Sequence, residues 1–246
     1  MPRPIFTIGH SNHTIDEFIG LLKHHGVTAL ADVRSHPYSR YCQHFCKAPL
    51  EGAIRKAGLS YVFLGKELGP RSTDPDCYID GTVSYERLAQ TPIFIEGLNR
   101  LVKGSETHSI ALMCAEHDPI TCHRAILVSR PLHTDGHTIQ HILRNGRLES
   151  HSELEDRLLK LYTPDQPEPE PEEAIAQLDL LSVFGTKARP TPSSTFEENN
   201  RKRDSSITVV RQLDVFKDWL EPQLEKRQRA IAIAYCQQGK KIAYRK

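Results

Sequence analysis

The amino-acid sequence predicts an α/β fold, an open and mostly parallel sheet with flanking helices, followed by a disordered linker and a short helical tail. Short apolar runs alternate with helical patterns over residues 1–162, as in strand–helix–strand units. The run Val27–Ala31 is continuously apolar, which is typical of a strand buried on both faces. After residue 162 the sequence becomes polar and rich in Pro, Glu, Ser and Arg, a composition that cannot offset the entropy of ordering.

The first strand and helix are predicted from local patterns. Pro4–Ile8 is aromatic and β-branched, and Gly9 ends it. Thr14 and Glu17 match the capping box that begins many helices. The same periodicities predict the other elements, with one helix broken or bent at Thr91-Pro92 and a long polar connection at residues 65–83. Further strands are expected at residues 27–31, 59–64, 109–113 and 136–142, and helices at residues 48–57, 85–102, 122–132 and 150–161.

Three parts are expected along the chain. Residues 1–162 form the α/β domain, and residues 163–206 form a disordered linker rich first in Pro and Glu and then in Ser and Arg. Residues 207–246 form a short basic tail with one helical stretch around Trp219 to Tyr235.

Composition narrows the class of protein. The formal net charge is +1, so no global field attracts the chain to nucleic acid or to an anionic membrane. No stretch approaches the roughly 20 apolar residues that a membrane helix needs. The N-terminal residues show no signal-peptide pattern, so we expect a cytoplasmic protein. In that reducing compartment the six cysteines should be thiols or ligands rather than disulfides.

Reactive side chains follow three of the predicted strands at their carboxyl ends. In open parallel sheets, ligands bind at this edge. The richest stretch is residues 110–129, where an apolar strand leads through a polar loop into a helix. We therefore expect one pocket, lined by His10, Ser11, Asp32, Arg34, Cys114, Glu116, Cys122, His123 and Arg124.

The two cysteines of this pocket allow three interpretations. A thiol near a helix start and near Arg and His has a lowered pKa, so Cys114 or Cys122 could act as a nucleophile or redox thiol. Alternatively, Cys114, Cys122 and His123, with Glu116 or His10, could ligate zinc or iron. In the third interpretation, Cys114 is a small buried residue that ends a strand.

The arginines and proton-transfer groups complete the predicted pocket. Arg34 and Arg124 suit an anionic ligand such as a nucleotide, a phosphate or a nucleic-acid end. The alternative for Arg34 is a salt bridge with Asp32 or Glu116. Glu116 or His123 would transfer protons.

Several motifs in order resemble the DUF488 family. They are Thr7-Ile-Gly-His-Ser11, Asp32-Val-Arg34 with Pro37 and Ser39, Tyr61 with Leu68-Gly69, and Cys114-x-Glu116-x-x-Pro-x-x-Cys122-His-Arg124. The resemblance spans about residues 4–145 and implies a shared site, since the family has no settled activity. A less extensive resemblance to rhodanese-like domains, in Ala29–Arg34 and Ala111–Arg124, implies thiol or sulfur-transfer chemistry, although the loop here is longer.

Two near-copies of a pentapeptide lie beyond the predicted domain, at Gln177–Leu181 and Gln212–Phe216. Both look like the segments by which bacterial DNA-replication and repair proteins bind the sliding clamp, and a flexible tether would present them. Alternatively, each is one turn of an amphipathic helix. The sequence thus leaves two classes open, an enzyme-like domain acting in DNA metabolism and a non-catalytic adaptor recruited to DNA machinery.

Overall fold

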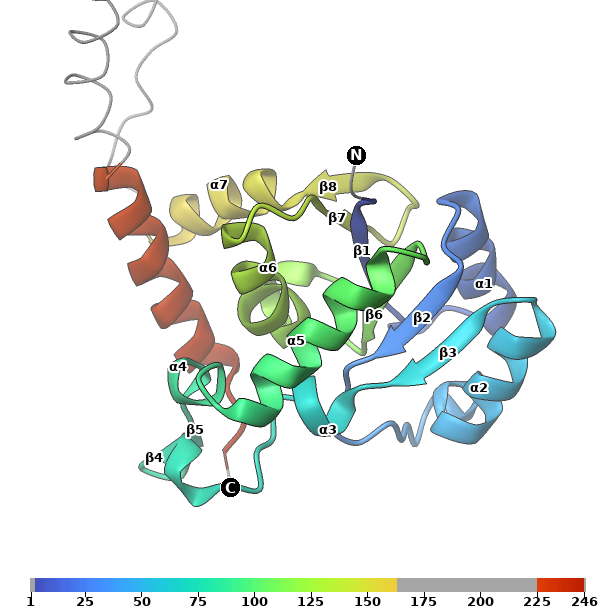
Figure 1. Ribbon diagram of the computed structural model, residues 1–246, viewed down its shortest axis with the longest axis horizontal. Helices are drawn as coiled ribbons and strands as arrows, with labels where there is room; N and C mark the ends of the chain where they lie inside the picture. The colour runs from blue at the N-terminus through green and yellow to red at the C-terminus, as the bar shows by residue number, and fades with distance from the viewer. Residues whose placement is uncertain (1–2, 163–224, 246) are drawn as a thin grey trace, which may run out of the picture. The chain divides into compact units, whose positions relative to one another are not determined.

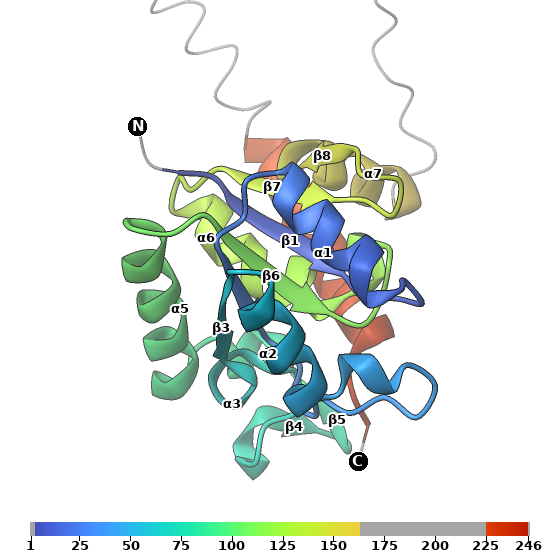
Figure 2. The ribbon, with the colours of Figure 1, turned by 90° about the vertical axis from the view of Figure 1, so that its right-hand side faces the viewer.

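A six-stranded sheet forms the centre of the computed structural model, which describes residues 3–162 and 225–245 (Figures 1 and 2). The strand order is β3-β2-β6-β1-β7-β8. The first five strands in this order pair in parallel, and β8 pairs antiparallel with β7. This arrangement confirms the predicted open, mostly parallel sheet. The strands are β1 Ile5–Gly9, β2 Ala29–Asp32, β3 Ser60–Phe63, β6 Ile110–Cys114, β7 Ile139–Ile142 and β8 Leu148–Ser150.

Helices flank the sheet. The helices with labels in Figure 1 are α1 Ile15–His24, α2 Lys47–Lys56, α3 Gly65–Leu68, α4 Tyr85–Leu88, α5 Pro92–Ser105, α6 Arg130–Thr134 and α7 His151–Tyr162. A π-helical segment, Arg124–Ser129, precedes α6, and a further helix occupies residues 225–242.

The alternation of side chains along each strand divides the core in two. On one face, Phe18 of α1 and Leu50 of α2 belong to the cluster that includes Leu30 of β2. On the other face, Phe94 of α5 belongs to the cluster that includes Leu112 of β6. Figure 2 shows α1 and α2 on one side of the sheet and α5 on another. Residues one position apart on a strand therefore face different helices.

Local signals set most element ends. The capping box of Thr14 and Glu17 is present at α1, as predicted. The predicted helix at residues 85–102 is two helices, because Pro92 begins α5 and the Thr91 side chain caps it. The long polar connection contains α3 and a two-stranded hairpin of β4 (Tyr78–Ile79) and β5 (Thr82–Val83), neither of which was predicted. The short strand β8 was also not predicted.

The C-terminal helix joins the α/β domain. Residues 231–246 form one compact unit with residues 1–162. Ala234 and Tyr235 are buried in the same core cluster as α5, and the Val83 amide donates to the Tyr244 carbonyl. The predicted helical tail is therefore present as residues 225–242, reaching further along the chain than expected.

The predicted linker at residues 163–206 and both pentapeptides lie outside the described residues. Among the residues that the structure does describe, no helix has the length and apolarity needed to cross a membrane.

Candidate cysteine–histidine centre

The residues predicted to line one pocket form two hydrogen-bonded groups. Asp32 lies two positions after Leu30, and Cys114 two positions after Leu112, so their side chains belong to opposite faces of the sheet. The register places Asp32 beside Met113, one residue before Cys114. The first group contains His10, Asp32 and Arg34, and the second contains Cys114, Glu116, Cys122, His123 and Arg124.

The second group, which we call the cysteine–histidine centre, joins the end of β6 to the turn before the π-helical segment. The Cys114 thiol lies 3.1 Å from Oε2 of Glu116 and 3.4 Å from Nδ1 of His123. The Cys122 thiol lies 3.0 Å from the same carboxylate oxygen. Both thiols and the imidazole are buried, whereas Glu116 is exposed. The carboxylate therefore lies between the buried thiols and solvent.

A backbone carbonyl fixes the tautomer of His123. Its Nε2 lies 3.0 Å from the carbonyl oxygen of Val33. A carbonyl oxygen only accepts, so Nε2 carries the proton and donates it. In the neutral ring, Nδ1 then has a free lone pair, and it faces the two sulfur atoms. That lone pair can accept a thiol proton or bind a metal ion.

The two thiols differ in pKa. Burial and the neighbouring Cys122 raise the pKa of the Cys114 thiol. Burial alone would also raise the pKa of Cys122, but its hydrogen bond with Cys114 and the positive charge of Arg124 outweigh burial and lower it. The Glu116 carboxyl is partly desolvated where it meets the two thiols, and this desolvation, followed by the charge of Cys122, raises its pKa. The centre therefore favours a thiolate at Cys122 beside groups that can hold protons.

The geometry also suits a metal ion. The sulfur atoms of Cys114 and Cys122 and a ring nitrogen of His123 all lie within 4.8 Å of one another. Tetrahedral zinc takes such ligands at about 2.0–2.3 Å, which places pairs of ligand atoms roughly 3.5–4 Å apart. Two thiolates and one imidazole are a donor set that zinc and iron accept.

The turn between the cysteines explains how seven intervening residues bring them together. The Asp118 side chain accepts from the Ile120 amide, and Pro119 begins a single 3-10 turn. Gly9 permits the close approach of β1, since a Cβ atom there would lie 1.8 Å from the Glu116 carbonyl oxygen. This approach was not recognised in the sequence, where Gly9 was interpreted only as the end of a strand.

Arg124 holds the loop of the centre from within. It is fully buried, and its guanidinium donates to the carbonyl oxygens of Glu116 at 2.6 Å and His117 at 3.1 Å. Its Nε donates to the Thr7 hydroxyl at 3.3 Å. These internal acceptors occupy the donors that the sequence assigned to an anionic ligand.

Arg34 is likewise occupied, in the alternative arrangement that the sequence left open. It forms a buried salt bridge with Asp32, with Nη2 at 2.7 Å and Nε at 2.9 Å from the carboxylate oxygens. Nη1 donates to Nε2 of His10, and burial with the Arg34 charge lowers the pKa of His10 to about 4. Tyr61 also donates to Asp32. The first group is therefore a buried ionic network.

Some participants were missed or placed differently. Thr7 and the Val33 carbonyl gave no local signal, because an apolar strand does not reveal which of its atoms bind distant residues. Ser11 is half-buried with φ 44°, and its amide donates to the Ala115 carbonyl, so it joins the two loops rather than either group. Cys42 lies nearby, with its thiol 3.8 Å from the Ser11 carbonyl.

One family model matches part of the α/β domain. The model of DUF488, a domain of unknown function, matches residues 14–130 and confirms the resemblance predicted from the motifs. The matched region contains both ion-pair residues of the first group and the whole cysteine–histidine centre. No curated protein and no solved structure matches the chain.

Proposed function

We propose that this DUF488 domain is a metalloenzyme whose cysteine–histidine centre binds zinc or iron. The observation that carries the proposal is the convergence of two buried sulfur atoms and one imidazole nitrogen whose proton lies on the opposite side of the ring. Three protein ligands with one open position are typical of catalytic metal sites, whereas structural sites have four.

The protein side chains support this assignment in different ways. Cys122, with its lowered pKa, supplies a thiolate, which is the form that binds a metal. The Val33 carbonyl orients His123 as outer-shell acceptors do in metal sites. Arg124 adds a fixed positive charge that favours the thiolate and holds the loop carbonyls.

Glu116 gives the centre a group that can transfer protons. Its carboxylate reaches both sulfur atoms, and the residue is exposed. Its raised pKa suits a group that both accepts and releases protons. A bound metal ion would polarise a substrate oxygen or a water molecule, and Glu116 would transfer the proton.

Metal content tests the proposal directly. Freshly purified wild-type protein is compared by elemental mass spectrometry with Cys114→Ala and with Cys236→Ala, whose cysteine lies on the C-terminal helix. We expect close to one zinc or iron per chain in the wild type and in Cys236→Ala, and a loss in Cys114→Ala. The absence of metal from the wild type, even after incubation with Zn²⁺ under reducing conditions, would refute the proposal and leave thiol chemistry at Cys122.

A second candidate function rests on the repeated pentapeptides. The near-copies at Gln177–Leu181 and Gln212–Phe216 would recruit the domain, as an adaptor, to a DNA sliding clamp. Peptides covering each segment, titrated onto purified clamp, test this role. We expect binding that is lost when the Gln and the following Leu are replaced by Ala, and failure of both peptides to bind would remove the argument for DNA metabolism.

A further inference from the structure

A continuous chain of buried side chains connects the C-terminal helix to the cysteine–histidine centre. The Tyr235 hydroxyl lies 2.8 Å from Nε2 of His151. Nδ1 of His151 lies 3.0 Å from Nε2 of His141, whose Nδ1 lies 2.8 Å from the Thr7 hydroxyl. Arg124 then donates to Thr7. We call these five residues, Tyr235, His151, His141, Thr7 and Arg124, the buried chain, and each is at most 1% exposed.

Its two ends give the chain a direction. Arg124 can only donate, so the Thr7 hydroxyl accepts from it and donates its own hydrogen bond to Nδ1 of His141. At the other end, the Glu155 carboxylate accepts from the Tyr235 hydroxyl at 3.2 Å. Both histidines then carry their proton on Nε2, and every donor in the chain has an acceptor.

The opposite direction is less satisfactory. If Tyr235 donated to His151, the Glu155 carboxylate would lose its tyrosine proton. His141 would then donate to Thr7, which already accepts from Arg124, and the Thr7 hydroxyl proton would have no acceptor within the chain.

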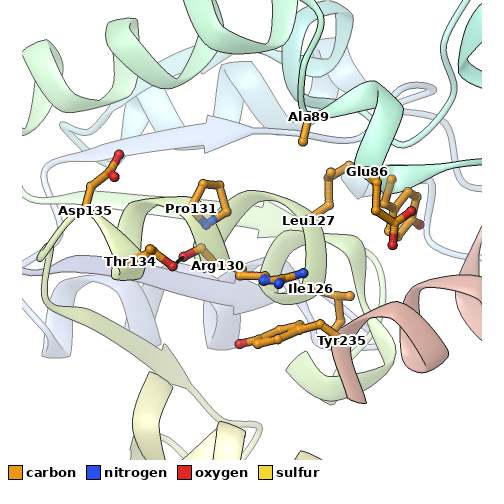
Figure 3. A pocket seen from close by; sticks show the side chains of 10 residues that line it. Glu86, Ala89, Ile126, Leu127, Arg130, Pro131, Thr134, Asp135 and Tyr235 are labelled. Carbon is orange, nitrogen blue, oxygen red and sulfur yellow. Dashed lines mark hydrogen bonds between the residues drawn. The ribbon is translucent and has the colours of Figure 1, made fainter. Parts of the chain in front are cut away.

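Tyr235 itself is held on two sides. Its ring packs against Arg130, whose guanidinium carbon lies 4.5 Å from the ring centroid. Figure 3 shows the two side chains lying together on the wall of a cavity of about 310 Å³. The hydroxyl at the end of this ring lies 2.8 Å from Nε2 of His151, so the packing of the ring fixes the position from which the hydroxyl acts.

We propose that Tyr235 is a positioning residue for the loop that carries Glu116, acting through the buried chain. Arg124 is the link, because the same guanidinium bonds Thr7 at one edge and the Glu116 and His117 carbonyls at the other. This inference rests on the proposed function, since the loop joins the ligands Cys114 and Cys122 and carries Glu116, the proton-transfer group. A helix separated by more than 60 residues from the DUF488 domain thereby sets the geometry of its centre.

The experiment breaks the buried chain at Tyr235 or at Thr7 in the full-length protein. Zn²⁺ affinity is measured by competition with a chromophoric chelator for the wild type, Tyr235→Phe and Thr7→Val. Tyr235→Phe removes one hydroxyl group, and Thr7→Val removes another while keeping the side-chain shape. We expect both to weaken Zn²⁺ binding about tenfold, the lower end of the effect of losing an outer-shell partner.

Two matched controls separate positioning from general damage. Thr7→Ser keeps the hydroxyl and should restore wild-type affinity. Tyr244→Phe changes a second tyrosine of the C-terminal segment, one that packs on Arg71 outside the buried chain, and should bind as the wild type does. Wild-type affinity in Tyr235→Phe, or equal losses in Thr7→Ser and Thr7→Val, would overturn the inference.

One further measurement does not depend on zinc. Imidazole ¹⁵N shifts should assign both His141 and His151 to the Nε2–H tautomer in the wild type, and the signals of both rings should change in Tyr235→Phe. If the wild type binds no zinc, the proposed function fails, whereas other tautomers in the wild type or unchanged signals in Tyr235→Phe would separately overturn this inference.

Discussion

Lowering the pH from 6 to 5 should destabilise the α/β domain through two buried histidines. Burial, followed by the nearby His133 and Arg130, lowers the pKa of His151 to about 3. Burial, followed by His151 and Arg124, also lowers the pKa of His141 well below its usual value. Both rings therefore stay neutral in the folded protein at pH 5.

The sign follows from proton binding. An unfolded histidine titrates near pH 6.5, so below that pH the unfolded chain binds protons that the folded protein does not. The stability is fully present above pH 6.5 and is lost as the pH falls toward the folded pKa. Between pH 6 and pH 5 the neutral His151 ring costs the domain about 1.2 kcal/mol of unfolding free energy, from the ~1.36 kcal/mol per pKa unit. His141, whose pKa is also lowered, adds a loss of the same sign.

The assay is urea unfolding at pH 6 and pH 5. His151→Gln is the informative variant, because a glutamine amide can accept from His141 and donate to Tyr235 without titrating. Its loss of stability over this interval should be smaller than that of the wild type by about 1 kcal/mol. The same substitution at the exposed His24 serves as the control. Equal losses in wild type and His151→Gln would refute the assignment of a neutral buried ring.

Two further predictions concern the residues that shape the strand ends. Gly9→Ala places a Cβ atom 1.8 Å from a loop carbonyl and should cost at least about 1–3 kcal/mol of unfolding free energy by urea titration. Gly20→Ala, on an exposed position of α1 with no atom within 4 Å, should instead stabilise by about 0.5–1 kcal/mol, and equal effects would contradict the argument. Arg34→Met leaves Asp32 buried without its partner and should cost about 3–5 kcal/mol. Arg55→Met, in an exposed pair on α2, should change little, and a similarly small cost for Arg34→Met would show that Asp32 is neutralised another way.

Periodicity predicted the sheet and its main helices because these depend on local patterns. Continuous apolar runs identified the central strands, and the capping box at Thr14 identified the start of α1. The β4–β5 hairpin and β8 escaped because strands of two or three residues show no period. The helical tail was expected, but its packing against the core depends on contacts across more than 60 residues.

The predicted strand ends identified side chains that the structure brings together, but they did not show that these side chains form two separate hydrogen-bonded groups. Asp32 and Cys114 both end buried strands, and the sequence shows which residues of the same strand share a face with each of them. It does not show how the two strands are aligned, and in the structure Asp32 pairs with Met113 rather than with Cys114. A shift of one residue in register transfers every side chain of a strand to the other face. The register is set by packing between segments about 80 residues apart, so one predicted pocket became two groups.

The two groups nevertheless share one element, the end of β2. The Val33 carbonyl accepts a hydrogen bond from Nε2 of His123, while the residues on either side of Val33, Asp32 and Arg34, form the buried salt bridge on the opposite face. A backbone carbonyl is present whatever the side chain at position 33. A substitution of Val33 can therefore remove the acceptor that sets the His123 tautomer only if it changes the backbone geometry. The salt bridge holds the residues on both sides of this carbonyl, so Arg34→Met should weaken Zn²⁺ binding, measured by competition with a chromophoric chelator, although Arg34 forms no hydrogen bond with a ligand of the centre.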